Sequence, residues 1–123
     1  MPRIAWHVSK KQHDLDTSDF LTGYSPTYTD WEIITLFYSA MHHVDATFCH
    51  MRSSGMPIPE PINHLHRRKL IAQYLNPIVT DYGMLEGLSR WARYEEVTIV
   101  PSYVTEARSL HTNIRNHLRN YVR

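Results

Sequence analysis

Residues 31–50 read WEIITLFYSAMHHVDATFCH, and the spacing of their apolar side chains predicts an amphipathic helix. At 3.6 residues per turn, Ile34, Tyr38 and Phe48 fall on one side of this helix. Asp45 falls in the middle of the same side, with His42 at its edge. Because an isolated buried charge is strongly destabilising, the sequence predicts that Asp45 has a partner inside the protein.

Helical spacing recurs along the chain. The expected helices cover residues 3–21, 29–53, 64–75, 77 to about 96, and 101 to the C-terminus. Thr29 and Glu32 match a capping box with Thr29 as the N-cap, Asn63 suits an N-cap, and Pro77 suits the first turn of a helix. The third and fourth helices could alternatively stack as one kinked helix. The pattern predicts an all-α fold, an antiparallel four- to five-helix bundle, in a single domain over residues 1–123.

Two segments interrupt the helical pattern. Residues 53–61, SSGMPIPEP, contain three prolines and one glycine, which predicts a surface loop. Residues 95–103, EEVTIVPSY, are locally strand-like, but a lone strand has no pairing partner. We therefore expect this second segment to be a connection.

The composition limits the kinds of protein this chain can be. Lys and Arg number 13 and Asp and Glu 12, so the formal charge of +1 gives no overall attraction to nucleic acid. The single cysteine excludes an internal disulfide and a cysteine-based zinc site. The N-terminus lacks a signal-peptide core and no apolar run is long enough to span a membrane, so we predict a cytoplasmic protein without a membrane partner.

The third predicted helix also carries a charge on its apolar side. Arg67 shares a face with Leu70 and Ile71, as Asp45 does with apolar residues in the second helix. A carboxylate facing a guanidinium recovers much of the energy lost on burial, so we expect Asp45 and Arg67 to pair. His42 and His64 should lie at the rim of the same cleft, which would make the group either a functional site or a structural polar network.

His42, Asp45 and His64 could together bind a metal ion. The chain contains no Glu-x-x-His or His-x-x-x-His pair, and Arg67 would repel a cation. We therefore predict neither a metal nor a cofactor.

Aromatic and basic residues elsewhere suggest a nucleotide or RNA surface. Tyrosine rings can stack on bases and arginines can bind phosphates, although such residues are also common at core edges. Trp91 is expected to face outward, against either a partner or a covering loop, and His43, His50 and His66 are expected in solvent. Arg108, Arg115 and Arg119 form a cationic stripe beside the apolar stripe of the last helix. The predicted nucleotide- or RNA-binding residues are Tyr38, Arg68, Tyr82, Arg93, Tyr94, Arg108 and Arg115.

Three stretches resemble the HEPN-domain proteins of bacteria and archaea: FYSAMHHVDATF, then His64-Leu65-His66-Arg67, then YGMLEGLSRWARY. The resemblance covers about residues 31–94 and implies a HEPN-like helical bundle that is commonly a homodimer. It also implies a role in RNA cleavage, in toxin–antitoxin or phage-defence systems, or in nucleotide binding beside a nucleotidyltransferase. Many members carry an arginine followed, after four to six residues, by a histidine. No arginine here has a histidine at that spacing.

Three functions follow as hypotheses. In a metal-independent endoribonuclease, His42 and His64 would transfer protons, Arg67 would stabilise the phosphate, and Asp45 would orient one of these groups. In a non-catalytic module, the same cleft and the arginine stripe would bind RNA or a nucleotide. In a structural role, the chain would be the partner of a toxin, an antitoxin or a nucleotidyltransferase. We also expect a homodimer.

Overall fold

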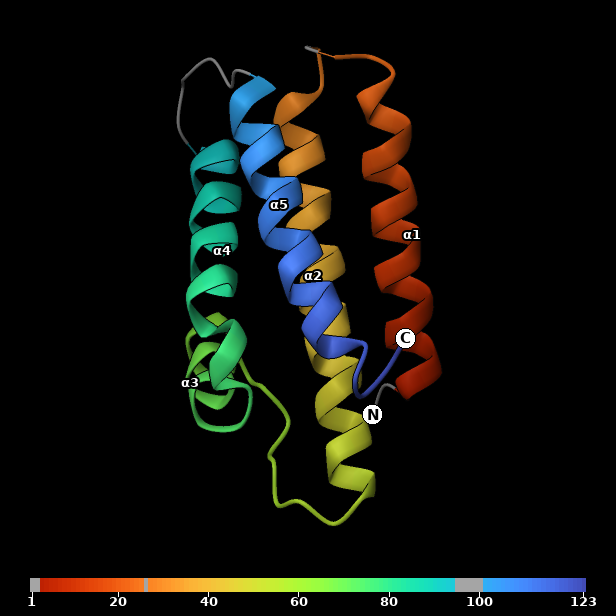
Figure 1. The fold of residues 1–123 in the computed structure, drawn as a ribbon, viewed down its shortest axis with the longest axis vertical. Helices are drawn as coiled ribbons and strands as arrows, with labels where there is room; N and C mark the ends of the chain where they lie inside the picture. The colour runs from red at the N-terminus through yellow and green to blue at the C-terminus, as the bar shows by residue number, and fades with distance from the viewer. Residues whose placement is uncertain (1–2, 26, 95–100) are drawn as a thin grey trace.

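A computed structural model describes residues 3–25, 27–94 and 101–123, and its elements are all helical (Figure 1). The helices are α1 (Ile4–Thr22), α2 (Thr29–Ser53), α3 (His64–Tyr74), the 3₁₀ turn η1 (Asn76–Ile78), α4 (Val79–Tyr94) and α5 (Pro101–Leu118). The described residues contain no strand. The predicted all-α helical bundle is therefore confirmed.

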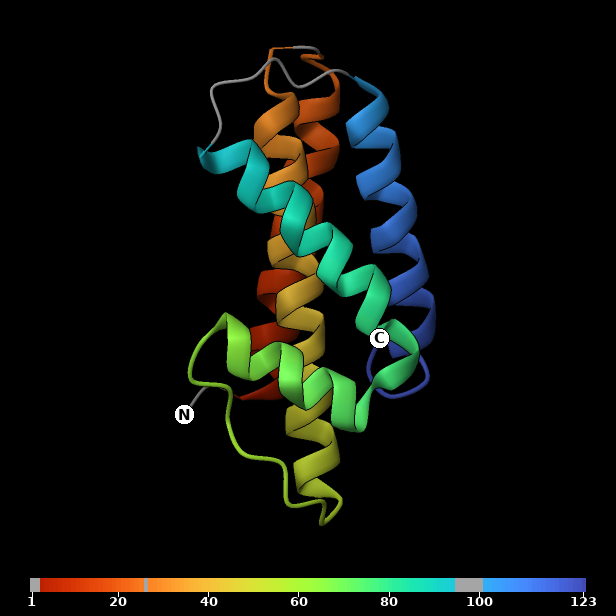
Figure 2. The same cartoon turned by 90° about the vertical axis from the view of Figure 1, so that its left-hand side faces the viewer.

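The long helices run alternately up and down. In Figure 1, α1 rises, α2 descends, α4 rises and α5 descends, so α1 begins and α5 ends in the lower half of the view. The central helix is α2, which contacts α1, α4 and α5. The short α3 lies beside the start of α4 (Figure 2). This arrangement places the middle of α2, where Asp45 lies, within reach of the other helices.

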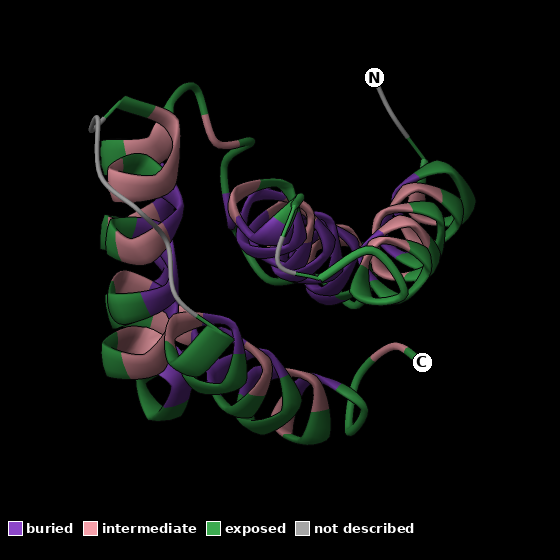
Figure 3. Cartoon of the chain, turned by 90° about the horizontal axis from the view of Figure 1, so that it is seen from above, coloured by how far each residue is buried: buried purple, intermediate pink, exposed green. Residues whose placement is uncertain are grey.

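The apolar sides of the helices form the core, but that of α2 is turned from the predicted one: Ile34 and Phe48 are buried, whereas Tyr38 is only partly buried and Phe37 is fully buried instead. Seen from above, the buried positions of each helix face the interior (Figure 3). Phe37 and Phe48 of α2, Leu85 of α4, and Ile114 and Leu118 of α5 are fully buried. Trp91 is half-buried against this core and its ring centroid lies 4.8 Å from that of Tyr103. The prediction that Trp91 faces outward is therefore wrong, because a side chain of α5 covers it.

The helix ends agree with most of the predicted signals. Asn63 caps α3, since its side chain accepts a hydrogen bond from the His66 amide at 2.7 Å. Pro77 lies in η1, and the non-helical backbone of Leu75 separates α3 from α4, so the two do not form one kinked helix. α5 begins at Pro101 as predicted. Residues 95–100, which hold most of the predicted connection and the expected end of the fourth helix, lie outside the described residues.

The predicted capping box at the start of α2 is wrong. Thr29 is the first helical residue rather than the N-cap, which is Tyr28. The Glu32 carboxylate does not return to the start of its own helix, because Oε2 accepts a hydrogen bond from Thr22 at 3.1 Å and lies 3.5 Å from the Arg108 guanidinium. Glu32 therefore links α2 to α1 and α5. No helix within the described residues combines the length and the apolar character that crossing a bilayer requires.

Candidate functional site

Asp45 and Arg67 form a paired ion bridge between α2 and α3, as predicted. Arg67 Nε donates to Asp45 Oδ1 at 2.8 Å and Nη2 donates to Oδ2 at 3.1 Å. Each residue is 9% exposed. This two-point geometry is the strongest arrangement for an arginine and a carboxylate, and it occupies the two groups with each other. The pair leaves Arg67 Nη1, which lies 3.5 Å from His64 Nδ1, and Asp45 also lines a cavity.

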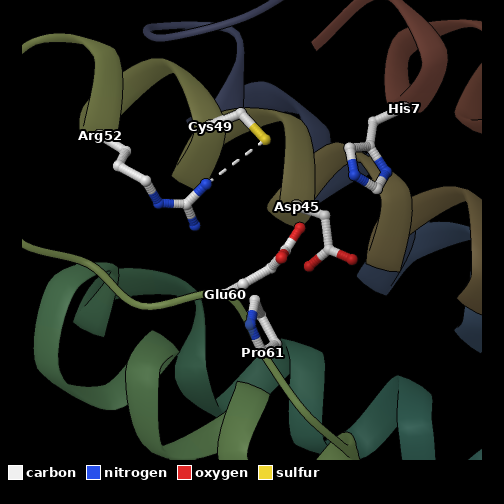
Figure 4. Close-up of a pocket in the computed structure, with 6 residues that line it drawn as sticks. All are labelled: His7, Asp45, Cys49, Arg52, Glu60 and Pro61. Carbon is white, nitrogen blue, oxygen red and sulfur yellow. Dashed lines mark hydrogen bonds between the residues drawn. The ribbon is translucent and has the colours of Figure 1, made fainter. Parts of the chain in front are cut away.

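A small cavity lies beside Asp45 (Figure 4). Its volume is about 160 Å³, and Asp45 lines it together with His7, Cys49, Arg52, Glu60 and Pro61. The Asp45 and Glu60 side chains approach this space from α2 and from the loop before α3, while Arg52 Nη1 lies 3.8 Å from the Cys49 sulfur. His42 and His64 are not among the lining residues. The cleft expected to unite both histidines with the ion pair is therefore not formed at this cavity.

His42 is buried against α1 rather than placed at a rim. Its Nδ1 lies 3.1 Å from His7 Nδ1, and the Trp6 ring packs edge-on at 5.3 Å between centroids. Burial, followed by repulsion from His7, lowers the pKa of His42 to about 4. Its imidazole is consequently neutral at pH 7, and one of the two histidines must donate the shared hydrogen bond.

His64 lies at the other side of the ion pair, beside a carboxylate that sequence reasoning missed. Its Nδ1 is 3.6 Å from Glu86 Oε2 and 3.5 Å from Arg67 Nη1. Burial and then the neighbouring arginines lower the pKa of His64, while Glu86 acts in the opposite direction. Glu86 is only 2% exposed, because it lies with Tyr82 and Leu85 on the inward side of α4. The helical spacing that pointed to Asp45 could have identified it.

Glu86 gathers two arginines on the outer surface of α3 and α4. Arg68 Nε lies 3.1 Å from Glu86 Oε1, an ion pair whose angles do not make a hydrogen bond. Arg90 Nη2 lies 3.8 Å from Oε2. The Arg68 and Arg90 side chains are 39% and 54% exposed, so one buried carboxylate holds two cations that still face solvent.

Arg93 joins this surface to α2 through Tyr38, and it also packs on its neighbour Tyr94 in α4. Arg93 Nη1 lies 2.6 Å from the Tyr38 hydroxyl oxygen, and its guanidinium carbon lies 5.7 Å from the Tyr38 ring centre and 5.4 Å from that of Tyr94. Tyr94 is 74% exposed. Tyr82, also predicted to bind bases, is 1% exposed, so it is a core residue and that prediction is wrong.

The arginine stripe of α5 divides into two parts. Arg108 donates to Asp19 at 2.8 Å and to the Thr22 hydroxyl at 2.6 Å, so it binds α1 rather than facing a ligand freely. Arg115 and Arg119 instead line a cavity between α1 and α5. The sequence prediction of a ligand-binding role therefore fits Arg115 better than Arg108.

The remaining histidines differ in their surroundings. His43, expected in solvent, is 2% exposed and donates to the Val122 carbonyl oxygen at 2.6 Å, so that prediction is wrong. Burial lowers the pKa of His43 to about 4. His50 is exposed as predicted, while His66 is half-buried and accepts a hydrogen bond from the Ile62 amide. His111, which the sequence analysis did not single out, is buried and hydrogen-bonds to Ser39 at 3.0 Å.

Comparison with protein-family models, curated proteins and solved structures found no match. Within the part of the chain that the structure describes, no three His, Cys, Asp or Glu side chains are grouped to hold a metal ion. The function must therefore be argued from the side chains themselves.

Proposed function

We propose that this protein is a non-catalytic module that binds single-stranded RNA on the outer side of α3 and α4. The observation that carries this proposal is the stacking of Arg93 against Tyr38 and the exposed Tyr94, beside two solvent-facing arginines. We call this group the Arg–Tyr surface; it consists of Tyr38, Arg68, Arg90, Arg93 and Tyr94. Four of these residues were predicted from the sequence to contact RNA, and Arg90 is an addition.

The chemistry of the Arg–Tyr surface suits unpaired RNA. Single-stranded RNA exposes the faces of its bases, which stack on tyrosine and arginine planes, while arginines neutralise the phosphates. Tyr94 offers an open ring, and Arg93 is held in place beneath it by Tyr38. Arg90 lies one turn before Tyr94 on α4, and Arg68 of α3 pairs with Glu86, two turns before Tyr94, so both could meet adjacent phosphates.

The placement of the histidines favours binding over cleavage. A ribonuclease of the expected kind needs one imidazole to accept a proton and another to donate one at the same phosphate. His42 is buried against His7, whereas His64 lies beside Glu86. Arg67, which would stabilise the phosphate, already donates two of its hydrogen bonds to Asp45. These contacts support a structural role for the group formed by His42, Asp45, His64 and Arg67.

Membership of the HEPN family, a homodimer, and an antitoxin or nucleotidyltransferase partner remain predictions from the resemblance. Trp91 does not support a dimer, since it does not face outward and its ring packs on Tyr103 of the same chain. A purely structural partner role is the competing function, and it predicts no affinity for RNA.

The test measures the fluorescence anisotropy of a short labelled single-stranded RNA carrying a 5′-hydroxyl. Tyr94→Ala should weaken binding roughly 5- to 150-fold, because stacking of one base on an aromatic ring contributes about 1–3 kcal/mol. Arg90→Gln should lower the slope of log K against log salt by roughly 0.7, the value for one phosphate contact on a single strand.

Two matched variants serve as controls. Tyr24→Ala removes an exposed tyrosine from the turn between α1 and α2, and Lys69→Gln removes an exposed cation from α3 outside the Arg–Tyr surface. Both should bind RNA like the unmodified protein. Equal affinities for Tyr94→Ala and Tyr24→Ala, or no binding at all, would refute the proposal.

A further inference from the structure

A second basic site lies on a different side of the bundle, between α1 and α5. A cavity of about 270 Å³ is lined by Lys11, Gln12, Arg115, Arg119 and Arg123. Four of these side chains are cationic, the fifth is an amide, and none is acidic. The cavity therefore concentrates positive charge in a chain whose overall charge is only +1.

The cations of this cavity lack acidic partners. Elsewhere in the protein, Arg67 pairs with Asp45, and Arg108 pairs with Asp19. Within the described residues, no ion pair involves any of the four cations lining the cavity. Because like charges in a partly enclosed space repel each other, an anionic ligand would stabilise this arrangement.

Lys11 is the most informative of these side chains. It is 8% exposed, so a charge on its ammonium group is costly unless an anion compensates it. Burial, then repulsion from Arg115 and Arg119, lowers the pKa of Lys11. Arg115 shows a related feature, since its Nε is buried and has no hydrogen-bond partner. The Arg115 Nε group is thus buried without a hydrogen-bond partner, and Lys11 has no acidic partner among the described residues.

Buried hydrogen bonds hold the cavity walls in place. The Ser39 hydroxyl donates to the Lys11 carbonyl oxygen at 2.8 Å and accepts from His111 Nε2 at 3.0 Å, which links α1, α2 and α5. At the C-terminal end, His43 holds the Val122 carbonyl next to Arg123. The cations are therefore brought together by the fold before any ligand arrives, which lowers the entropy lost on binding.

We propose that this cavity binds a polyphosphate group, the chain of linked phosphates carried by a nucleoside triphosphate, by a 5′-triphosphorylated RNA end, or by inorganic triphosphate. A polyphosphate places several negative charges in a small volume, as four converging cations require, and arginines bind its oxygens through paired hydrogen bonds. An internal RNA phosphodiester carries a single charge and suits an extended surface better. This site is separate from the Arg–Tyr surface and does not depend on it.

An adjoining cavity bears on which molecule carries the polyphosphate. It has a volume of about 200 Å³ and shares Arg115 with the first. Its walls include the apolar side chains of Leu15 and Leu36 and the carboxylate of Asp19, which also pairs with Arg108 in the same wall. An apolar wall beside a carboxylate suits a nucleoside, whose base is planar and whose ribose hydroxyls donate hydrogen bonds.

The test is calorimetric titration of the full chain with inorganic triphosphate, together with thermal melts. Triphosphate should bind at least tenfold more tightly than sulfate and should raise the melting temperature of the unmodified protein. The double variant Arg119→Gln/Arg123→Gln changes only exposed side chains and should reduce the affinity at least tenfold. Lys69→Gln removes one exposed charge elsewhere and should leave binding unchanged.

Lys11→Met provides a second, opposing readout. Methionine keeps the apolar length of the buried side chain while removing its charge, so the ligand-free variant should melt at a higher temperature than the unmodified protein. Triphosphate should raise the melting temperature of the variant by less than it raises that of the unmodified protein. Loss of binding without this gain in the melting temperature, absence of binding at millimolar triphosphate, or equal binding of sulfate would overturn the proposal.

Three ligands then distinguish the source of the polyphosphate. Tighter binding of a nucleoside triphosphate than of inorganic triphosphate supports the site and assigns the nucleoside to the adjoining cavity. Equal binding supports a site that recognises the polyphosphate alone, and tighter binding of a 5′-triphosphorylated RNA supports recognition of an RNA end. The RNA that tests the Arg–Tyr surface carries a 5′-hydroxyl and therefore no polyphosphate. The two experiments thus test the two sites separately, and failure of one proposal does not decide the other.

Discussion

The Asp45 carboxylate holds the Arg67 guanidinium by two hydrogen bonds, and both side chains are 11% exposed. Asp45→Ala would leave a buried guanidinium without a counter-charge. We expect the free energy of unfolding to fall by about 3 kcal/mol, as is typical when one side of a buried ion pair is removed. Urea unfolding of the variant beside the unmodified protein measures this difference.

The double variant Asp45→Ala/Arg67→Met provides the control. Removing both charges should cost less than the sum of the two single changes, because neither charge then remains buried alone. If Asp45→Ala unfolds at the same urea concentration as the unmodified protein, the ion pair does not contribute to stability.

At the scale of single residues, the sequence predicted those features that depend on the spacing of residues within one helix. Asp45 and Arg67 stood out because each falls among apolar residues on its own helix, and their pairing followed from charge. His43 did not stand out, because its burial depends on the C-terminal segment returning to offer the Val122 carbonyl oxygen. The separation of His42 from His64 likewise depends on α1, which supplies His7 to one of them.

At the scale of helices, buried histidines join α1, α2 and α5. The pKa values of His42 and His43 are lowered to about 4 and that of His111 to about 3, in each case first by burial. The unfolded chain, with histidine pKa values near 6.5, binds more protons than the folded chain below that pH. Stability should therefore be constant with respect to these groups above about pH 6.5 and fall toward pH 4, by about 1.4 kcal/mol per pH unit for each histidine.

Urea unfolding between about pH 7 and about pH 4.5 checks this pH dependence. His43→Gln keeps a donor for the Val122 carbonyl oxygen but cannot titrate, so its stability should fall less steeply as the pH decreases. A free energy of unfolding that stays constant over this range would contradict neutral burial of these histidines.

Arg108 fastens α5 to α1 and to the buried Glu32 of α2. Arg108→Met keeps much of the side-chain length and removes these contacts. We expect a loss of roughly 1–3 kcal/mol in the free energy of unfolding, because Glu32 is left buried without a cation. RNA affinity, measured by anisotropy, should not change. A variant that keeps its stability but binds RNA more weakly would show that Arg108 contacts RNA, as the sequence predicted.

Helix positions were largely predictable, whereas their polar connections were not. Apolar spacing, Asn63 and the prolines located the helices because these signals act within one segment. The capping box failed because Thr22 and Arg108 bind the Glu32 side chain, and these residues lie on other helices. Tertiary contacts thus redirected a side chain whose local pattern favoured another role.

At the scale of the whole molecule, the described helices present two separate basic regions, while the buried Asp45–Arg67 pair joins α2 to α3. The Arg–Tyr surface lies on α3, α4 and the adjoining Tyr38 of α2, and the cavity lined by Lys11, Arg115 and Arg119 lies between α1 and α5. The sequence predicted four of the five residues of the Arg–Tyr surface and Arg115 of the cavity, but not how they are grouped, since each region draws residues from more than one helix. The apolar stripes predicted that the helices would pack, but not which exposed faces would meet.

The central claim is that the Arg–Tyr surface binds single-stranded RNA without cleaving it. The most direct measurement is titration of isotopically labelled protein with a 5′-hydroxyl RNA, followed by amide NMR spectra and by gel analysis of the RNA from the same sample. The account predicts shifts concentrated at Arg68, Arg90, Arg93 and Tyr94, with the RNA recovered intact. Cleaved RNA, or amide shifts that leave these four residues unchanged, would contradict it.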